Sequence, residues 1–124
     1  MSALSDVVVL EFARGVAGPY CGRLLADLGA TVIKFEPPSG DPLRLAAPLA
    51  GGESAFFNYL NAGKLSFVAP AVAAVPPEAL KRADVVVHDL LGIQAERLER
   101  MATAANPAAV VVSLSPYGRS GEKS

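Results

Sequence analysis

The sequence has few of the residues that would point to a metal or disulfide protein. It contains one cysteine, Cys21, one histidine, His88, and no tryptophan in 124 residues. A single cysteine excludes an internal disulfide and is typical of a reducing compartment, so we expect a cytoplasmic location. One Cys and one His also fall short of the usual zinc donor set, so we expect no metal centre.

Excess charge and long apolar runs are scarce as well. Lys and Arg number 11 against 12 Asp and Glu, for a net charge of −1, which argues against nucleic-acid and membrane partners. No stretch approaches the roughly 18 apolar residues of a membrane span, and the start, MSALSDVV, lacks the basic region of a signal peptide. Hydrophobic residues still make up 52%, which favours one domain, residues 1–124, with a sheet covered on both faces.

The first third of the chain predicts a strand, a helix and a second strand. The apolar run Val7–Phe12 is typical of a buried strand. Gly18 and Pro19 indicate a helix with proline at its first position, where no N–H is needed, and Gly29 ends it. The next strand covers 31–35, and a ligand crevice is expected at the carboxyl ends of both strands.

The rest of the chain continues this alternation. We expect helices over 54–60, 77–82 and 94–105, strands over 65–68, 85–87 and 109–114, and a loop or degenerate helix over 68–77. The predicted fold class is α/β, an open, mainly parallel, doubly wound (Rossmann-like) sheet with flanking helices.

The glycines of the first turn permit two interpretations. Free N–H groups at a helix start suit a phosphate or carbonyl oxygen, but a tight turn without a ligand would look the same. Gly15, Gly18 and Gly22 are spaced by three and four, unlike G-x-G-x-x-G, so a nicotinamide-dependent oxidoreductase domain is the less favoured hypothesis. Glu36 stands where a ribose-binding acid would lie, although a lone acid there is commonly solvated.

Five segments resemble the N-terminal part of the family III CoA-transferases (CaiB/BaiF), which include formyl-CoA transferase and α-methylacyl-CoA racemase. The segments are RGVAGPYC at 14–21, LLADLGATVIKFEPPSGDPLR at 24–44, FFNYLNAGKLS at 56–66, ADVVVHDLLG at 83–92 and NPAAVVVSLSPYGRSG at 106–121. They follow family order over nearly the whole chain. The resemblance implies a Rossmann-type fold that takes a CoA thioester as substrate, with no tightly bound cofactor.

The resemblance, together with the phosphates of CoA, gives eight candidate CoA-binding residues. They are Arg14, Val16, Ala17, Lys34, Arg44, Asn61, Lys64 and Arg97. The first three form the turn after the first strand, where backbone groups would meet the ligand. Asn61 and Lys64 match an Asn-x-x-Lys motif, and the basic residues would bind phosphates. For a single Lys or Arg, a solvated surface role is the commoner alternative.

The chain also departs from the family pattern. Ala62 and Leu65 stand at the two positions where the family usually has an arginine. A family motif close to Glu-Asn-Phe-Arg-Pro-Gly reads HDLLGI at 88–93 of this chain. Asp89 adds a like charge beside an anionic ligand, so we expect weak CoA binding. We expect His88 to be a hydrogen-bonded structural residue, and Cys21 to be a small buried side chain.

The activity implied by the resemblance is transfer of CoA between an acyl-CoA and a carboxylic acid. The family's nucleophilic aspartate lies beyond the position of Gly121, so we expect a shortened chain without a catalytic residue. Family subunits interlock, which implies a homo-oligomer or a partner chain carrying the rest of the fold. The alternative is a degenerate stand-alone domain that binds a CoA-like ligand or serves as a structural partner.

Overall fold

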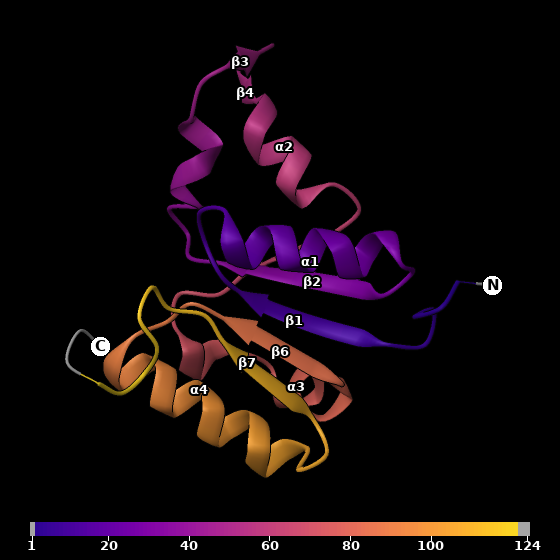
Figure 1. Cartoon of the computed structure of the whole chain (residues 1–124), viewed down its shortest axis with the longest axis vertical. Helices are drawn as coiled ribbons and strands as arrows, with labels where there is room; N and C mark the ends of the chain where they lie inside the picture. Colours follow the sequence, from indigo (N-terminus) through magenta and orange to yellow (C-terminus); the bar gives the residue numbers. More distant parts are fainter. Residues whose placement is uncertain (1, 122–124) are drawn as a thin grey trace.

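The computed structural model describes residues 2–121, which contain a sheet of five parallel strands (Figure 1). The strands are β1 (Val8–Phe12), β2 (Thr31–Glu36), β5 (Leu65–Val68), β6 (Val85–His88) and β7 (Val110–Ser113), in the order β5-β2-β1-β6-β7. The chain winds outward from β1 to β5 and then crosses back to β6, so the winding reverses between β1 and β6. This confirms the predicted open, doubly wound sheet.

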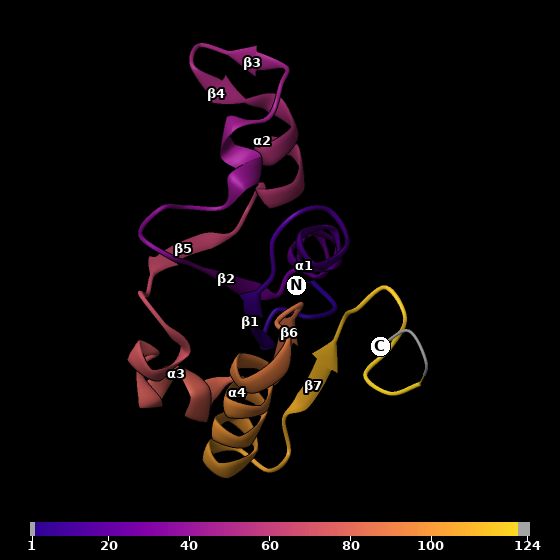
Figure 2. The same cartoon turned by 90° about the vertical axis from the view of Figure 1, so that its left-hand side faces the viewer.

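Helices cover both faces of the sheet (Figure 2). One face carries α1 (Ala17–Asp27), and the other carries α3 (Pro77–Arg82), α4 (Gly92–Ala105) and the short 3-10 turn η2 (Val72–Ala74). A projecting unit beside α1 holds η1 (Pro42–Leu45), the hairpin β3 (Leu49–Ala50) and β4 (Glu53–Ser54), and α2 (Ala55–Asn61). None of the described helices is long and apolar enough to cross a membrane.

Side chains of the central strands alternate between two cores. Val9 faces α1 and Leu10 faces α3 and α4, and both are fully buried. Toward the carboxyl end the two faces diverge in chemistry, because Glu11 continues the α1 face while Phe12 continues the other. The next strand repeats the pattern with Lys34 and Phe35. One face therefore ends in charged groups and the opposite face in aromatic rings.

Helix α1 begins two residues before its predicted start. Ala17 is the first helical residue, so Pro19 is the third, where its missing N–H still costs no helical hydrogen bond. Val16 is the N-cap residue, and its side chain accepts no capping bond. Gly29, with φ +104°, ends the helix as predicted.

Two glycines let α1 lie directly on β1 and the turn that follows it. A Cβ at Gly18 would lie 2.2 Å from the Ala13 Cβ, and a Cβ at Gly22 would lie 2.0 Å from Glu11 Oε1. Neither position has room for a side chain. Gly15 differs, because its φ of +79° is the left-handed conformation that the turn itself uses. The spacing of these three glycines is thus explained by helix packing and turn geometry.

We predict that Gly18→Ala destabilises the fold by about 1–3 kcal/mol, because the added methyl overlaps the buried Ala13 side chain. The matched variant Ala13→Gly removes the overlapping atom. Urea unfolding of the two single variants and the double variant should show the double more stable than the sum of the single effects predicts. Strict additivity would mean that this close approach is not what fixes glycine at position 18.

Candidate functional site

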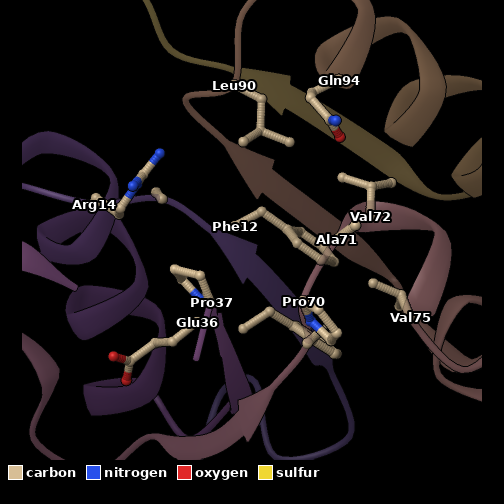
Figure 3. A pocket seen from close by; sticks show the side chains of 13 residues that line it. Phe12, Arg14, Glu36, Pro37, Pro70, Ala71, Val72, Val75, Leu90 and Gln94 are labelled. Carbon is tan, nitrogen blue, oxygen red and sulfur yellow. The ribbon is translucent and has the colours of Figure 1, made fainter. Parts of the chain in front are cut away.

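A cavity of about 230 Å³ opens at the carboxyl edge of the sheet, on the face of α3 and α4 (Figure 3). Its apolar wall includes the stacked rings of Phe12 and Phe35, whose centroids are 4.6 Å apart at an interplanar angle of 11°. Other lining residues come from the ends of β2, β5 and β6 and from η2: Pro37, Pro70, Ala71, Val72, Val75 and Leu90. Polar groups reach it from Arg14, Glu36 and Gln94. Such a mix of apolar walls and a few polar groups is typical of small-molecule sites.

Of the eight predicted residues, Arg14 lines this cavity, and Val16, Ala17 and Arg97 lie outside its lining. Arg14 follows β1 and lines the cavity, and its backbone N–H donates to Asp89 Oδ2 at 2.9 Å. Val16 and Ala17 follow at the start of α1, with Val16 52% exposed. Arg97 is exposed on α4, about one turn beyond Gln94. These positions combine helix-terminal amides with two arginine side chains.

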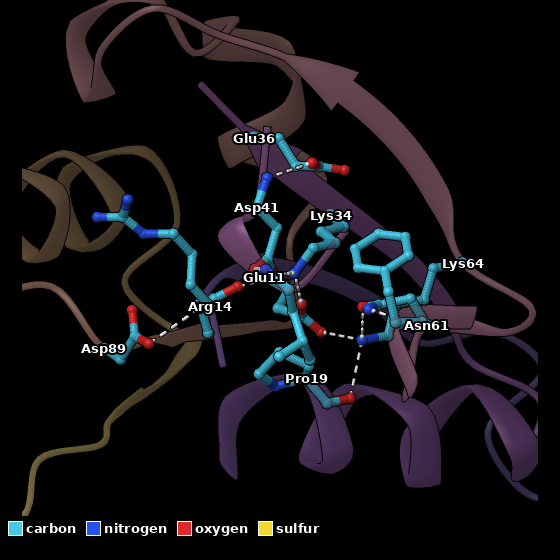
Figure 4. A network of polar contacts seen from close by, with 12 residues as sticks. Glu11, Arg14, Pro19, Lys34, Glu36, Asp41, Asn61, Lys64 and Asp89 are labelled. Carbon is cyan, nitrogen blue, oxygen red and sulfur yellow. Dashed lines mark hydrogen bonds and ion pairs between the residues drawn. The ribbon is translucent and has the colours of Figure 1, made fainter. Parts of the chain in front are cut away.

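The other four predicted residues lie on the opposite face, in a network centred on Glu11 (Figure 4). The buried Glu11 carboxylate accepts hydrogen bonds from Lys34 Nζ at 3.0 Å and from Lys64 Nζ at 2.6 Å. Lys64 Nζ also donates to the Pro19 carbonyl at 2.8 Å and to Asn61 Oδ1 at 2.7 Å. Burial lowers the pKa of Lys64, and its bond to Glu11 opposes that shift.

Lys34 has no free donor directed at solvent. Besides Glu11, its ammonium group donates to the Ala13 carbonyl at 2.8 Å and lies 3.0 Å from Asp41 Oδ2. Lys34 is only 1% exposed, so the alternative of a solvated surface lysine is wrong. Because the side chains of Lys34 and Lys64 are each 2% exposed, neither ammonium group is open to a ligand in this structure.

Arg44 is held in a charged pair at the edge of the same network. Its Nε and Nη2 donate to the two Glu36 carboxylate oxygens at 2.8 and 2.6 Å. The guanidinium carbon lies 4.1 Å from the centroid of the Phe57 ring. The hydrogen bond from Arg44 lowers the pKa of Glu36, and the same bond raises the pKa of Arg44. Glu36 is 4% exposed, so the expectation of a solvated acid at this position is wrong.

His88 is confirmed as a hydrogen-bonded structural residue. It is fully buried, its Nδ1 accepts the Leu90 N–H at 3.1 Å, and its Nε2 lies 2.7 Å from Glu99 Oε2. An Nδ1 that accepts a backbone N–H leaves the proton on Nε2, which then donates to Glu99. Arg119 donates to the same Glu99 oxygen at 2.7 Å and lowers the pKa of that carboxyl. The cluster joins the end of β6, α4 and the segment after β7.

Cys21 lies on α1 and is half-buried rather than fully buried as expected. Burial is the main cause that raises its pKa, with the Glu11 charge adding to it, so the thiol is a poor nucleophile at neutral pH. Across residues 2–121 no group of three or more His, Cys, Asp or Glu side chains gathers as metal ligands would.

The sequence interpretation missed most of the cavity wall and both acids of the buried network. Phe12, Phe35 and Ala71 line the cavity, and Glu11 and Asp41 pair with Lys34. A signal was available for Phe12 and Phe35, because residues at the carboxyl ends of parallel strands border the ligand crevice. Ala71 follows a loop whose position depends on tertiary contacts, and no local pattern predicts it.

We predict that Glu11→Gln costs about 3 kcal/mol or more, because two buried ammonium groups lose their shared negative charge. Urea unfolding measures the loss. Glu78→Gln is the matched control, since Glu78 forms an exposed pair with Lys81 at 3.4 Å, and it should cost less than about 0.5 kcal/mol. Equal free energies of unfolding for the two variants would show that the buried network does not stabilise the fold by this amount.

Comparisons with known proteins agree with this architecture. The sequence profile described as CoA-transferase family III matches residues 4–124. The chain is 36% identical to succinyl-CoA:mesaconate CoA-transferase of Haloarcula hispanica, with 98% of the chain and 34% of that protein covered. It is 35% identical to succinate–glutarate CoA-transferase of Agrobacterium fabrum, with 95% of the chain and 33% of that protein covered.

Solved structures extend the similarity to the fold. A CaiB/BaiF family protein from Brucella suis superimposes with a TM-score of 0.83 at 31% identity, covering 98% of this chain and 35% of that one. Rv3272 from Mycobacterium tuberculosis gives the same TM-score at 30% identity, covering 98% and 36%. The chain thus spans about a third of the length of the relatives it matches. The family profile, these identities and the shared fold establish that the chain belongs to CoA-transferase family III.

Proposed function

We propose that this chain is the CoA-binding portion of a family III acyl-CoA transferase, which moves CoA between an acyl-CoA and a carboxylic acid. The observation that carries the proposal is the apolar cavity at the carboxyl edge of a doubly wound sheet. No residue here is proposed as the nucleophile, because the aspartate implied by the resemblance matches none of them. A cytoplasmic location is part of the proposal and rests on the single unpaired cysteine.

The dimensions and walls of the cavity suit one end of CoA. At about 230 Å³ it is smaller than the roughly 300–1,000 Å³ of sites that enclose a drug-sized ligand. Its wall of Phe12 and Phe35 favours a flat, apolar group, and Gln94 offers hydrogen-bonding atoms. The adenine end of CoA meets these requirements, and the rest of the molecule would lie outside the cavity.

Phosphates and pantetheine would then pass the mouth of the cavity. Arg14 and Arg97 are the cations we assign to the phosphates, because both are exposed, Arg14 lines the cavity, and Arg97 follows the lining residue Gln94 by one turn of α4. The amides at Val16 and Ala17 would bind oxygen atoms of the ligand. Lys34, Arg44, Asn61 and Lys64 are assigned a supporting role instead, since their polar groups are engaged with Glu11, Glu36 and each other.

The two alternatives make different demands on the same cavity. An oxidoreductase domain would need a ribose-binding acid at Glu36, but that carboxylate is engaged by Arg44 and by the Asp41 N–H. A stand-alone structural domain would need a partner surface, and the candidate for one is a set of exposed apolar residues on α1. The exposed apolar residues Val16, Tyr20, Leu24 and Leu28 recur every four positions, so they share one stripe. Edge strand β5 adds Leu65, Phe67 and Val68.

We propose that this stripe, called the α1 stripe, is covered in the working protein by a second copy of the chain or by a partner chain. Four apolar residues in one row, each between 43% and 52% exposed, form a contiguous patch of the kind that marks interaction sites. The coverage proposal is compatible with the CoA proposal, because no residue of the α1 stripe lines the cavity. Val16 takes part in both, with its backbone amide assigned to the ligand and its side chain to the partner.

We predict that the chain binds CoA with a dissociation constant of about 100 μM or weaker and that Ala71→Phe abolishes binding by filling the cavity. Ala71 is exposed and lines the cavity, so a larger side chain there should not disturb the core. Ala73→Phe is the matched control, an exposed alanine two positions away that does not line it. Calorimetric titrations with CoA and NAD measure both variants. NAD binding tighter than CoA binding would reject the proposal in favour of an oxidoreductase domain.

We predict that the chain associates with itself as its concentration rises, and that Leu24→Gln weakens this association. The substitution places a polar group in the middle of the α1 stripe, where Leu24 is 46% exposed. Sedimentation over a concentration series gives the mass. Leu45→Gln, at an 84% exposed leucine outside the stripe, should leave the association unchanged. A wild-type chain that stays monomeric at high concentration would exclude self-association and leave a different chain as the only partner.

A further inference from the structure

We propose that Asp89 is a specificity-determining residue that disfavours phosphate groups at the turn after β1 and so limits the affinity for CoA. The inference rests on the proposed CoA-binding function and adds to it a residue that works against binding. It concerns the crevice between β1 and β6, where the winding of the sheet reverses.

The backbone holds Asp89 firmly in this crevice. Its N–H donates to the Phe12 carbonyl at 3.3 Å, which continues the β1–β6 pairing by one residue. The preceding residue, His88, is fully buried, and the following residue, Leu90, is tied to His88 Nδ1 and lines the cavity. The main chain at Asp89 is therefore held in place, and the Arg14 N–H holds the carboxylate at the turn.

The carboxylate already occupies a place that an anionic ligand would take. Asp89 Oδ2 accepts the Arg14 N–H at 2.9 Å, in the turn that leads into α1 (Figure 4). Backbone amides at such a turn attract anions, and here the protein supplies its own. A phosphate arriving at this turn would lose that donor and would also face a like charge.

The other charges around the crevice do not cancel this effect. The Arg14 side chain is exposed and lines the cavity, and Arg97 is exposed on α4. Both can attract phosphates from solvent, but within residues 2–121 neither guanidinium forms an ion pair with the Asp89 carboxylate that would neutralise it in place. Uncharged groups of a ligand, such as adenine, ribose or the pantetheine amides, meet no such repulsion. The crevice therefore favours uncharged parts of a ligand next to the start of α1. The phosphates would lie closer to the side chains of Arg14 and Arg97.

The chain offers a matched control for Asp89 at the other end of the same strand. Asp84 directly precedes β6, and its Oδ2 accepts the Val8 N–H at 2.9 Å. Each aspartate accepts one backbone N–H next to β1, but Asp84 lies at the amino edge of the sheet and Asp89 at the carboxyl edge. Asp89→Asn and Asp84→Asn remove the same charge and keep an oxygen acceptor.

Calorimetric titration of wild type and both variants tests the proposal, with CoA and adenosine as ligands. We expect Asp89→Asn to strengthen CoA binding about tenfold and Asp84→Asn to change it less than twofold. Adenosine carries no phosphate, so its affinity should stay within twofold in all three proteins. Asp89→Ser, which keeps a hydroxyl acceptor, should shift CoA affinity in the same direction if the Asn variant does not fold.

The possible failures point to different errors. If CoA binds wild type and Asp89→Asn equally, the inference about Asp89 is overturned and the proposed function stands. If adenosine affinity rises as much as CoA affinity, the substitution has reshaped the cavity, and the electrostatic inference is overturned. If none of the proteins binds CoA or adenosine, the proposed function fails, and the inference fails with it.

Discussion

The Glu11 carboxylate, fully buried between two lysines, is the interaction on which the rest of this structure depends. Burying three charged groups is costly unless each is paired and hydrogen-bonded. Here the pairing recruits distant parts of the chain, because Lys34 lies on β2 and Lys64 follows α2. Lys64 also binds the carbonyl of Pro19 on α1. This one network therefore fixes the positions of three elements, β2, α2 and α1, relative to β1.

This network determines which face of the sheet is left for a ligand. Its lysines, Lys34 and Lys64, are engaged on the α1 face, so their ammonium groups are not available to phosphates. The opposite face keeps an apolar cavity whose stacked rings come from the neighbouring positions Phe12 and Phe35. A site with aromatic walls and only exposed arginines at its mouth favours the base of a nucleotide over its phosphates. The weak CoA binding that we propose would be the physical consequence of that division between the faces.

The fold was predictable because its strands and main helices have strong local patterns. Runs such as Val85–Val87, and the helix signals at Gly29 and Pro77, appear in the structure at or near the expected positions. The hairpin β3–β4 was not predicted, since two-residue strands have no periodicity. The site was harder to predict. Lys34 stands between Ile33 and Phe35, and a lysine inside an apolar strand indicates a buried ion pair, but its partners Glu11 and Asp41 are far away in sequence or lie in a loop.

Some family-like residues of this chain are required by the packing of the fold, and others are not. Gly18 belongs to the first of the segments that resemble the family and Gly22 directly follows that segment, yet each is required by a close approach to Ala13 or Glu11. These two glycines therefore indicate that α1 packs directly on β1, and they are not evidence for CoA binding. Asp89, Leu91 and Ile93 are different, because no core contact requires them, and the last two are 69% and 70% exposed. Because packing does not constrain these residues, the segment after β6 is where we propose that this chain's ligand preference is decided.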